Sequence, residues 1–240
     1  MLAESRPLLQ NQLVEATPGK PRGDPAIEPY QRTTRPSPPI VNLPPLTLGL
    51  IIAMIGIFGL TTLAPGYLGQ WLIVHFAFIP AAWFTDIWPA WSLIAAPLTY
   101  AFLHGGLLHL AMNGVMLAVM GQVLERKLGA LSFFSVFAAG AIGGAFVHAL
   151  IGGAPEVPLV GASAGVGALY GSGLVLHGRG ISLGPNTQIL MALTAFFIIT
   201  NLLGMVMPLF GSIAYVAHLG GFVTGILVTA WLVRPGVRLS

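Results

Sequence analysis

Six long apolar runs constrain this chain more than any other feature of its sequence. A helix needs about 20 mostly apolar residues to cross the hydrocarbon core of a bilayer, where no water can satisfy backbone polar groups. Only 7% of the 240 residues are charged, against about 25% in an ordinary soluble domain. The runs cover residues 46–64, 106–124, 130–151, 161–177, 187–207 and 212–233. We therefore predict an all-α membrane protein with six transmembrane helices.

The stretch between the first two runs differs from the runs themselves. It is apolar but broken by prolines, and it holds four of the chain's five tryptophans: Trp71, Trp83, Trp88 and Trp91. Tryptophan is enriched at the membrane–water interface, because its ring is apolar and its N–H is polar. We therefore expect a long interfacial loop between helices 1 and 2.

The two ends of the chain are polar. Residues 1–44 are rich in proline, as in "TPGKPRGDPAIEPY", and have too little apolar surface to offset the entropy of ordering. We interpret 1–44 as a disordered cytoplasmic tail, 45–234 as one six-helix membrane domain, and 235–240 as a short cytoplasmic C-terminal tail.

The Lys and Arg residues all fall on one side of this topology. They lie in the N-terminal tail, in the 2–3 and 4–5 connections and at the C-terminal end, at positions 6, 20, 22, 32, 35, 126, 127, 179, 234 and 238. Because cytoplasmic loops carry the excess of basic residues, both termini are expected in the cytoplasm. The net charge of +3 is then a topology signal, and we expect no nucleic-acid partner.

Polar residues recur at a similar shallow depth in the three spans that run inward. His104 precedes the second span, His109 and Asn113 lie within it, Ser163 begins the fourth, and His218 lies near the start of the sixth. Polar groups inside a membrane are costly and tend to face a partner or a water-filled cavity. Their common level predicts a shared site near the outer surface.

These residue types suit acyl transfer. A serine hydroxyl becomes a nucleophile when a neutral histidine takes its proton, and Ser163 and His218 supply that pair. The i, i+4 spacing puts His109 and Asn113 on one helix face, where both can donate hydrogen bonds to an oxyanion. No Asp or Glu lies at this level, so we expect a dyad rather than a triad.

Structural interpretations stay open for each residue. Ser163 sits in "GASAG", a pattern that also lets two membrane helices pack closely, and a structural hydrogen-bond pair that holds helices together is the alternative role of His109 and Asn113. Small residues four apart on three spans predict close helix packing: Gly140/Gly144, Gly167/Gly171 and Gly221/Gly225. The histidines come with no acidic fourth ligand, and the chain has no cysteine, so we expect no metal and no cofactor.

At these residues the chain resembles the rhomboid family of intramembrane serine proteases. The resemblance rests on "HGGLLHLAMN" in the second span, "GASAG" in the fourth and "AHLGGFVTG" in the sixth, and it covers about residues 46–233. It implies a six-helix rhomboid-like bundle in which Ser163 is the nucleophile and His218 the general base. The family cleaves transmembrane segments of other proteins, often after a small residue.

The resemblance also implies supporting roles. His109, Asn113 and the Ser163 N–H would form the oxyanion hole, His104 would support it, and Gly161 and Gly221 would allow close backbone approach. The sequence departs from the family pattern in two places. Trp91 lacks the usual neighbouring Arg, and Gly167 stands where an aromatic ring often stacks on the catalytic histidine. What orients His218 is therefore open.

Three functions remain to be compared. The first is an intramembrane serine endopeptidase that acts on transmembrane substrates in the lipid bilayer. The second is a catalytically inactive rhomboid-like protein that binds membrane clients. The third is a small transporter or channel. Two observations argue against it: the polar groups cluster near one face, and no inverted repeat is evident. A bacterial inner membrane is the expected location, and the sequence leaves the oligomeric state undecided.

Overall fold

The computed structural model describes residues 42–64, 66–152, 155–207 and 214–234. The tail expected at 1–44 lies outside this part except for its last three residues, and the tail expected at 235–240 lies outside it entirely. The proposed division of the chain into a tail and a membrane domain therefore stays a prediction.

The described residues fold into helices, as the apolar runs predict. Five helices are long and apolar enough to cross a membrane: α1 Pro45–Leu63, α4 Leu107–Leu128, α5 Ala130–Ile151, α7 Thr187–Val206 and α8 Tyr215–Leu232. The fourth predicted span corresponds to α6, Ser163–Gly178, which has only 16 residues. The all-helical prediction is confirmed, while the length of α6 falls short of the about 20 residues of a standard span.

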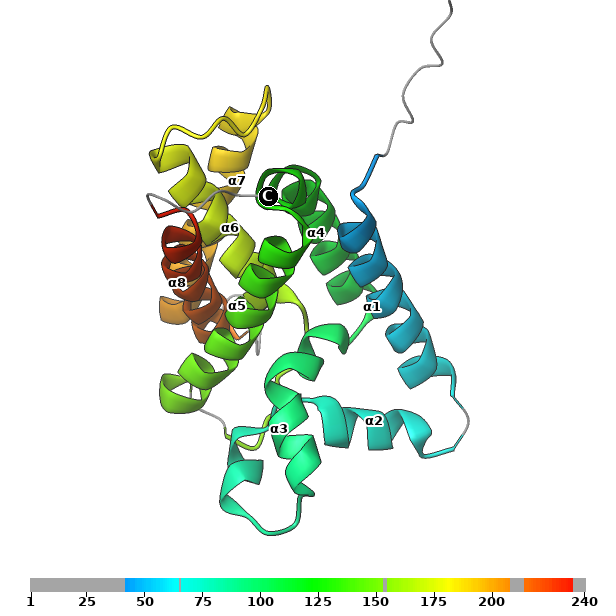
Figure 1. Ribbon diagram of the computed structural model, residues 1–240. Coiled ribbons are helices and arrows are strands. Elements are labelled where there is room, and N and C mark those ends of the chain that lie inside the picture. The colour runs from blue at the N-terminus through cyan, green and yellow to red at the C-terminus, as the bar shows by residue number, and fades with distance from the viewer. Residues whose placement is uncertain (1–41, 65, 153–154, 208–213, 235–240) are drawn as a thin grey trace, which may run out of the picture. The chain divides into compact units, whose positions relative to one another are not determined.

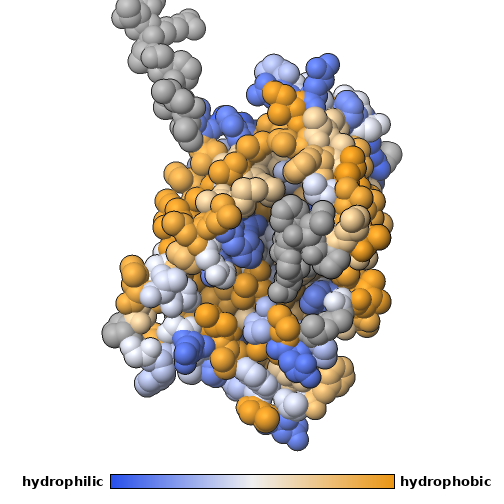
Figure 2. All heavy atoms as spheres, turned by 180° about the vertical axis from the view of Figure 1, so that it is seen from behind, coloured by the Kyte–Doolittle hydropathy of each residue, from blue (hydrophilic) through white to orange (hydrophobic). Residues whose placement is uncertain are grey.

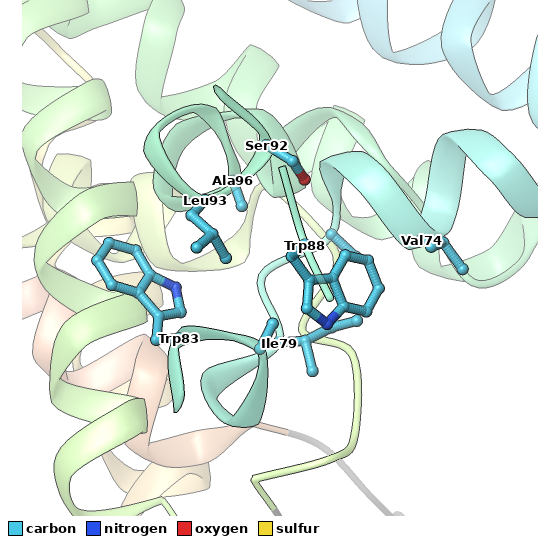
Figure 3. A pocket seen from close by; sticks show the side chains of 9 residues that line it. Val74, Ile79, Trp83, Trp88, Ser92, Leu93 and Ala96 are labelled. Atoms are coloured by element: carbon cyan, nitrogen blue, oxygen red, sulfur yellow. The ribbon is translucent and has the colours of Figure 1, made fainter. Parts of the chain in front are cut away.

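The stretch between α1 and α4 contains four short helices. They are α2 Leu68–Phe76, η1 Pro80–Phe84, α3 Ala90–Thr99 and η2 Tyr100–Phe102. Figure 1 shows α2 and α3 at one end of the bundle, with α2 running across the direction of α1. Aromatic rings pack here, since His75 stacks on Trp71 and on Trp91 with centroid distances of 4.4 and 5.7 Å, and the two tryptophan rings are themselves 6.3 Å apart. Trp83 and Trp88 lie on opposite sides of Leu93, around a small hollow (Figure 3).

Apolar side chains cover much of the outside of the bundle. Figure 2 shows them across the middle of one face, with hydrophilic residues gathered mainly toward two ends. Exposed apolar residues occur on all five long helices, among them Ile52, Val115, Leu131, Phe196 and Leu227. A surface of this kind is stable next to lipid, where apolar side chains lose nothing by being exposed.

The centre of the bundle is α6, which packs against α5 and α8. Eleven of its 16 residues are buried. A Cβ atom added to Gly221 or Gly225 of α8 would collide with a backbone carbonyl of α6, at Ala164 or Ala168 respectively. A Cβ on Gly140 of α5 would collide with the side chain of Ala168. The prediction that these glycines permit close helix packing is confirmed.

A buried carboxylate ties the start of α1 to the end of α4. Glu125 is 6% exposed and accepts hydrogen bonds from the backbone N–H groups of Leu46 and Thr47, at 3.0 and 2.7 Å, and from Thr47 Oγ1 at 2.7 Å. These three hydrogen bonds offset the free-energy cost of burying the carboxylate. Because α4 carries His109 and Asn113, this junction fixes the helix on which part of the predicted site lies.

Candidate active site

The segment that leads into Ser163 is held by the elements between α1 and α4. The backbone N–H groups of Phe78 and Leu159 each donate to the other residue's carbonyl, at 3.2 and 2.8 Å. Further along, Gly161 N donates to Tyr100 O at 3.0 Å, while Tyr100 Oη donates to Ala141 O on α5 at 2.9 Å. The chain therefore enters α6 along a path set by hydrogen bonds on both sides.

Ser163 is the first residue of α6. The first backbone bond across this end of the helix runs from Val166 N to Ala162 O at 2.9 Å, so the N–H groups of residues 163–165 precede the helical ladder. These N–H groups and the positive end of the helix dipole make the position favourable for negative charge. Ser163 itself is partly exposed.

His109 and Asn113 of α4 lie over Gly161, two residues before Ser163. Gly161 has φ +115°, a conformation that favours glycine, and a Cβ atom there would lie 2.6 Å from His109 Nε2 and 3.5 Å from Asn113 Nδ2. Asn113 is 2% exposed, and its Nδ2 donates to His109 O at 3.1 Å. The predicted oxyanion donors thus lie beside the segment that begins α6.

His218 lies in the first turn of α8, close to α6. A Cβ on Gly167 would lie 2.7 Å from the His218 carbonyl oxygen. A Cβ on Gly144 of α5 would lie 2.5 Å from Ala217 O and 2.6 Å from Ala164 Cβ. The chain neighbours of Ser163 and His218 therefore meet at one point on α5, which brings the two predicted catalytic residues to the same level of the bundle.

No hydrogen bond joins Ser163 to His218 in the part of the chain that the structure describes; the His218 ring is bonded instead through Nδ1. Catalytic hydrogen bonds are often long without a substrate and tighten when one binds. The second ring nitrogen, Nε2, is the atom left for Ser163.

His104 lies in the connection between η2 and α4 and is 6% exposed. Its Nδ1 is 3.3 Å from Phe102 O, and its ring centroid is 5.2 Å from that of His109. The pKa of His104 is lowered to about 4, mainly by burial and secondly by the neighbouring His109, while the hydrogen bond to Phe102 opposes both. His104 therefore packs against His109 as a neutral ring.

The structure places two further residues at His218 that the sequence reasoning missed. Asn201 of α7 lies with its Oδ1 2.7 Å from His218 Nδ1, and the Phe197 ring centroid is 6.1 Å from the His218 ring. A signal for Asn201 was present in the sequence, since an amide in the middle of an apolar span is costly and points to a buried partner.

Among the residues that the structure describes, no three His, Asp or Glu side chains group closely enough to hold a metal ion. His104, His109 and His218 instead find hydrogen-bond or ring partners in the protein. The chemistry that this arrangement can support is that of a serine, a histidine and polar hydrogen-bond donors.

A family model, the Rhomboid domain, matches residues 88–235, which contain every residue of this site. The chain belongs to the rhomboid family. Rhomboid protease GlpG of Yersinia pestis is 27% identical over 216 residues, which cover 88% of this chain and 70% of that protein. Rhomboid protein 1, mitochondrial, of Saccharomyces cerevisiae is 33% identical over 149 residues, which cover 58% of this chain and 41% of that protein.

A plant protein also matches the chain. RHOMBOID-like protein 5 of Arabidopsis thaliana is 29% identical over 146 residues, which cover 60% of this chain and 45% of that protein. The chain thus covers less than half the length of the yeast and plant relatives. Family membership and the apolar helices together make this rhomboid a multi-pass integral membrane protein.

Proposed function

We propose that this rhomboid is an intramembrane serine endopeptidase that cleaves transmembrane segments of other membrane proteins. Ser163 is the nucleophile and His218 the general base in this proposal. The observation that carries it is the meeting of three helices at one level. There α4 brings His109 and Asn113 beside Gly161, α6 begins with Ser163, and α8 packs on α6 next to His218.

The proposed reaction proceeds in two halves. His218 Nε2 takes the proton from Ser163 as Oγ attacks the scissile carbonyl carbon, and the carbonyl oxygen becomes an oxyanion. His109, Asn113 and the Ser163 N–H donate hydrogen bonds to this oxyanion. The C–N bond then breaks, and the leaving amine takes the proton from the His218 ring.

Water completes the cycle. His218 removes a proton from a water molecule, the hydroxide attacks the acyl carbon, and the second oxyanion collapses to release the carboxylic acid product. Ser163 leaves as the alkoxide and recovers its proton from His218, which restores both groups. Neither half needs a metal or a cofactor.

The short α6 supports access of water to the site. A helix of 16 residues is about 24 Å long, against a hydrocarbon core about 30 Å thick. If the basic end of α6 at Arg179 lies at the cytoplasmic surface, Ser163 begins below the outer surface but within reach of water. We accordingly propose that α6 also crosses the membrane, which brings the number of spans to six, with both termini in the cytoplasm and a bacterial inner membrane as the location.

The test compares the full-length protein in detergent with variants of the dyad and with matched controls. Ser163→Ala and His218→Ala remove the proposed nucleophile and base. Ser172→Ala removes another serine of α6, which is fully buried, and His177→Ala removes an exposed histidine at the far end of that helix. Each protein is incubated with a model transmembrane substrate and, separately, with a fluorophosphonate probe.

We expect the parent and both controls to cut the substrate and take up the probe. Ser163→Ala should do neither, and His218→Ala should cut about 10²–10⁴-fold more slowly, the usual size of a general-base contribution. A different result would favour a client-binding rhomboid. In that case the folded parent neither cuts the substrate nor takes up the probe, and the parent and Ser163→Ala retain transmembrane proteins equally well in pull-downs.

A further inference from the structure

Asn201 is a buried amide in the transmembrane helix α7. It is 5% exposed, and both ends of its side chain are bonded. Nδ2 donates to Phe197 O on the same helix at 2.7 Å, and Oδ1 lies 2.7 Å from Nδ1 of His218 on α8. Burying a polar side chain inside a transmembrane helix is costly unless it has hydrogen-bond partners. One of the two partners of Asn201 is the proposed catalytic base, His218.

The hydrogen bond to Phe197 O determines which group of the Asn201 amide faces His218. A backbone carbonyl can only accept, so the group that contacts Phe197 O is the NH₂ group and the group that faces His218 is the carbonyl oxygen. An oxygen acceptor requires that Nδ1 of the ring carry the hydrogen. In a neutral imidazole the other nitrogen, Nε2, then holds the free lone pair.

A second residue of α7 supports the same ring. Phe197 lies one turn before Asn201, and its Cζ would be 3.1 Å from a Cβ on Gly167. The centroid of the Phe197 ring is 6.1 Å from that of the His218 ring, and Tyr170 stacks on the Phe197 ring at 4.8 Å. The ring missing at position 167 is thus replaced in space by a ring from another helix.

We propose that Asn201 is a positioning residue for His218, holding the imidazole as the Nδ1–H tautomer so that Nε2 faces Ser163 as a proton acceptor. This inference rests on the proposed function for its effect on rate, but the ring geometry that it predicts is measurable without any activity. Phe197 limits the tilt of the same ring from the side of α7.

A purely structural role makes a different prediction. If Asn201 only joined α7 to α8, its loss would lower stability but leave the tautomer of His218 unchanged. Thr194 offers a matched control, because it is 2% exposed, lies on the same helix and donates to Leu190 O of its own helix at 2.8 Å.

The experiment uses the full chain in detergent micelles as parent, Asn201→Leu, Asn201→Asp and Thr194→Ala. Leucine is close to asparagine in size but has no acceptor. Aspartate keeps an oxygen that accepts the Nδ1–H hydrogen bond. Each protein is labelled with ¹⁵N-histidine, and His218→Ala identifies the resonances of this ring. Proteolysis of a transmembrane substrate gives kcat and KM.

We expect the parent and Thr194→Ala to show His218 protonated at Nδ1. Asn201→Leu should shift the neutral ring toward the Nε2–H form and lower kcat by about 10- to 100-fold, as small misplacements of a catalytic group do, with little change in KM. Asn201→Asp should restore the Nδ1–H form and most of kcat.

Two results would overturn the proposal. One is an unchanged Nδ1–H ring in Asn201→Leu, whatever happens to the rate. The other is an equal loss of kcat in Thr194→Ala and Asn201→Leu. A parent that neither cuts substrate nor binds the serine probe would reject the proposed function, and the tautomer of His218 would then decide the positioning role alone.

Discussion

The imidazole of His109 occupies the space that a side chain at Gly161 would need. A Cβ at Gly161 would lie 2.6 Å from both Cε1 and Nε2 of that ring, and the backbone there has φ +115°. The glycine two residues before the proposed nucleophile therefore makes room for a side chain of α4. The contact that packs α4 on the start of α6 therefore also shapes the proposed oxyanion site.

Replacing Gly161 with alanine should therefore damage the proposed site, and the φ of +115° should add a cost in stability. The new methyl group should displace His109 from its proposed place beside the oxyanion, and loss of one such donor costs about 10²–10³-fold in kcat. Gly114→Ala on α4 is the control, since nothing lies within 4 Å of its added Cβ. Proteolysis rates and melting curves in detergent measure both effects. A Gly161→Ala enzyme as fast as Gly114→Ala would disprove the steric argument.

Gly221→Ala should lower stability, because its methyl group meets the carbonyl oxygen of Ala164 and forces α8 away from α6. Overpacking of this kind costs about 2 kcal/mol, and for a chain of this size that lowers Tm by roughly 4–8 °C. Thermal unfolding in the same detergent measures the shift, again against Gly114→Ala. An unchanged Tm for Gly221→Ala would show that the two helices can separate at little cost.

His104 should make stability depend on pH in the acid range. Its pKa is lowered from 6.5 to about 4 in the folded protein, first by burial and then by His109, so the unfolded chain binds more protons between these values. Stability therefore falls as the pH drops from about 6.5 to about 4, and is constant with respect to this group above and below that window.

The measurement is Tm as a function of pH for the parent, His104→Gln and His177→Gln. The Tm of His104→Gln should fall less than that of the parent as the pH drops across this window, because glutamine does not titrate. His177→Gln removes an exposed ring and should follow the parent. Identical curves for the parent and His104→Gln would mean that His104 takes no part in acid destabilisation.

The long helices follow from the sequence because a bilayer leaves few other options. The predicted runs and the observed helices agree within a few residues, as for 130–151 and α5, Ala130–Ile151. The region between α1 and α4 was predicted only as an interfacial loop, and it contains α2, η1, α3 and η2. Short helices there are set by contacts such as Tyr100 with Ala141, which composition does not reveal.

The sequence by itself determined the helical class, the glycine positions at which helices approach, and the residues proposed for the site. Apolar length, small residues and rare polar groups are properties of each segment taken alone. Only the tertiary structure decided what lies beside His218. Gly167 and Asn201 are 34 positions apart in the printed sequence, and the meeting of Asn201, Phe197 and His218 depends on how α7 packs against α6 and α8. A hydrogen bond between helices depends on their relative placement, which no single segment encodes.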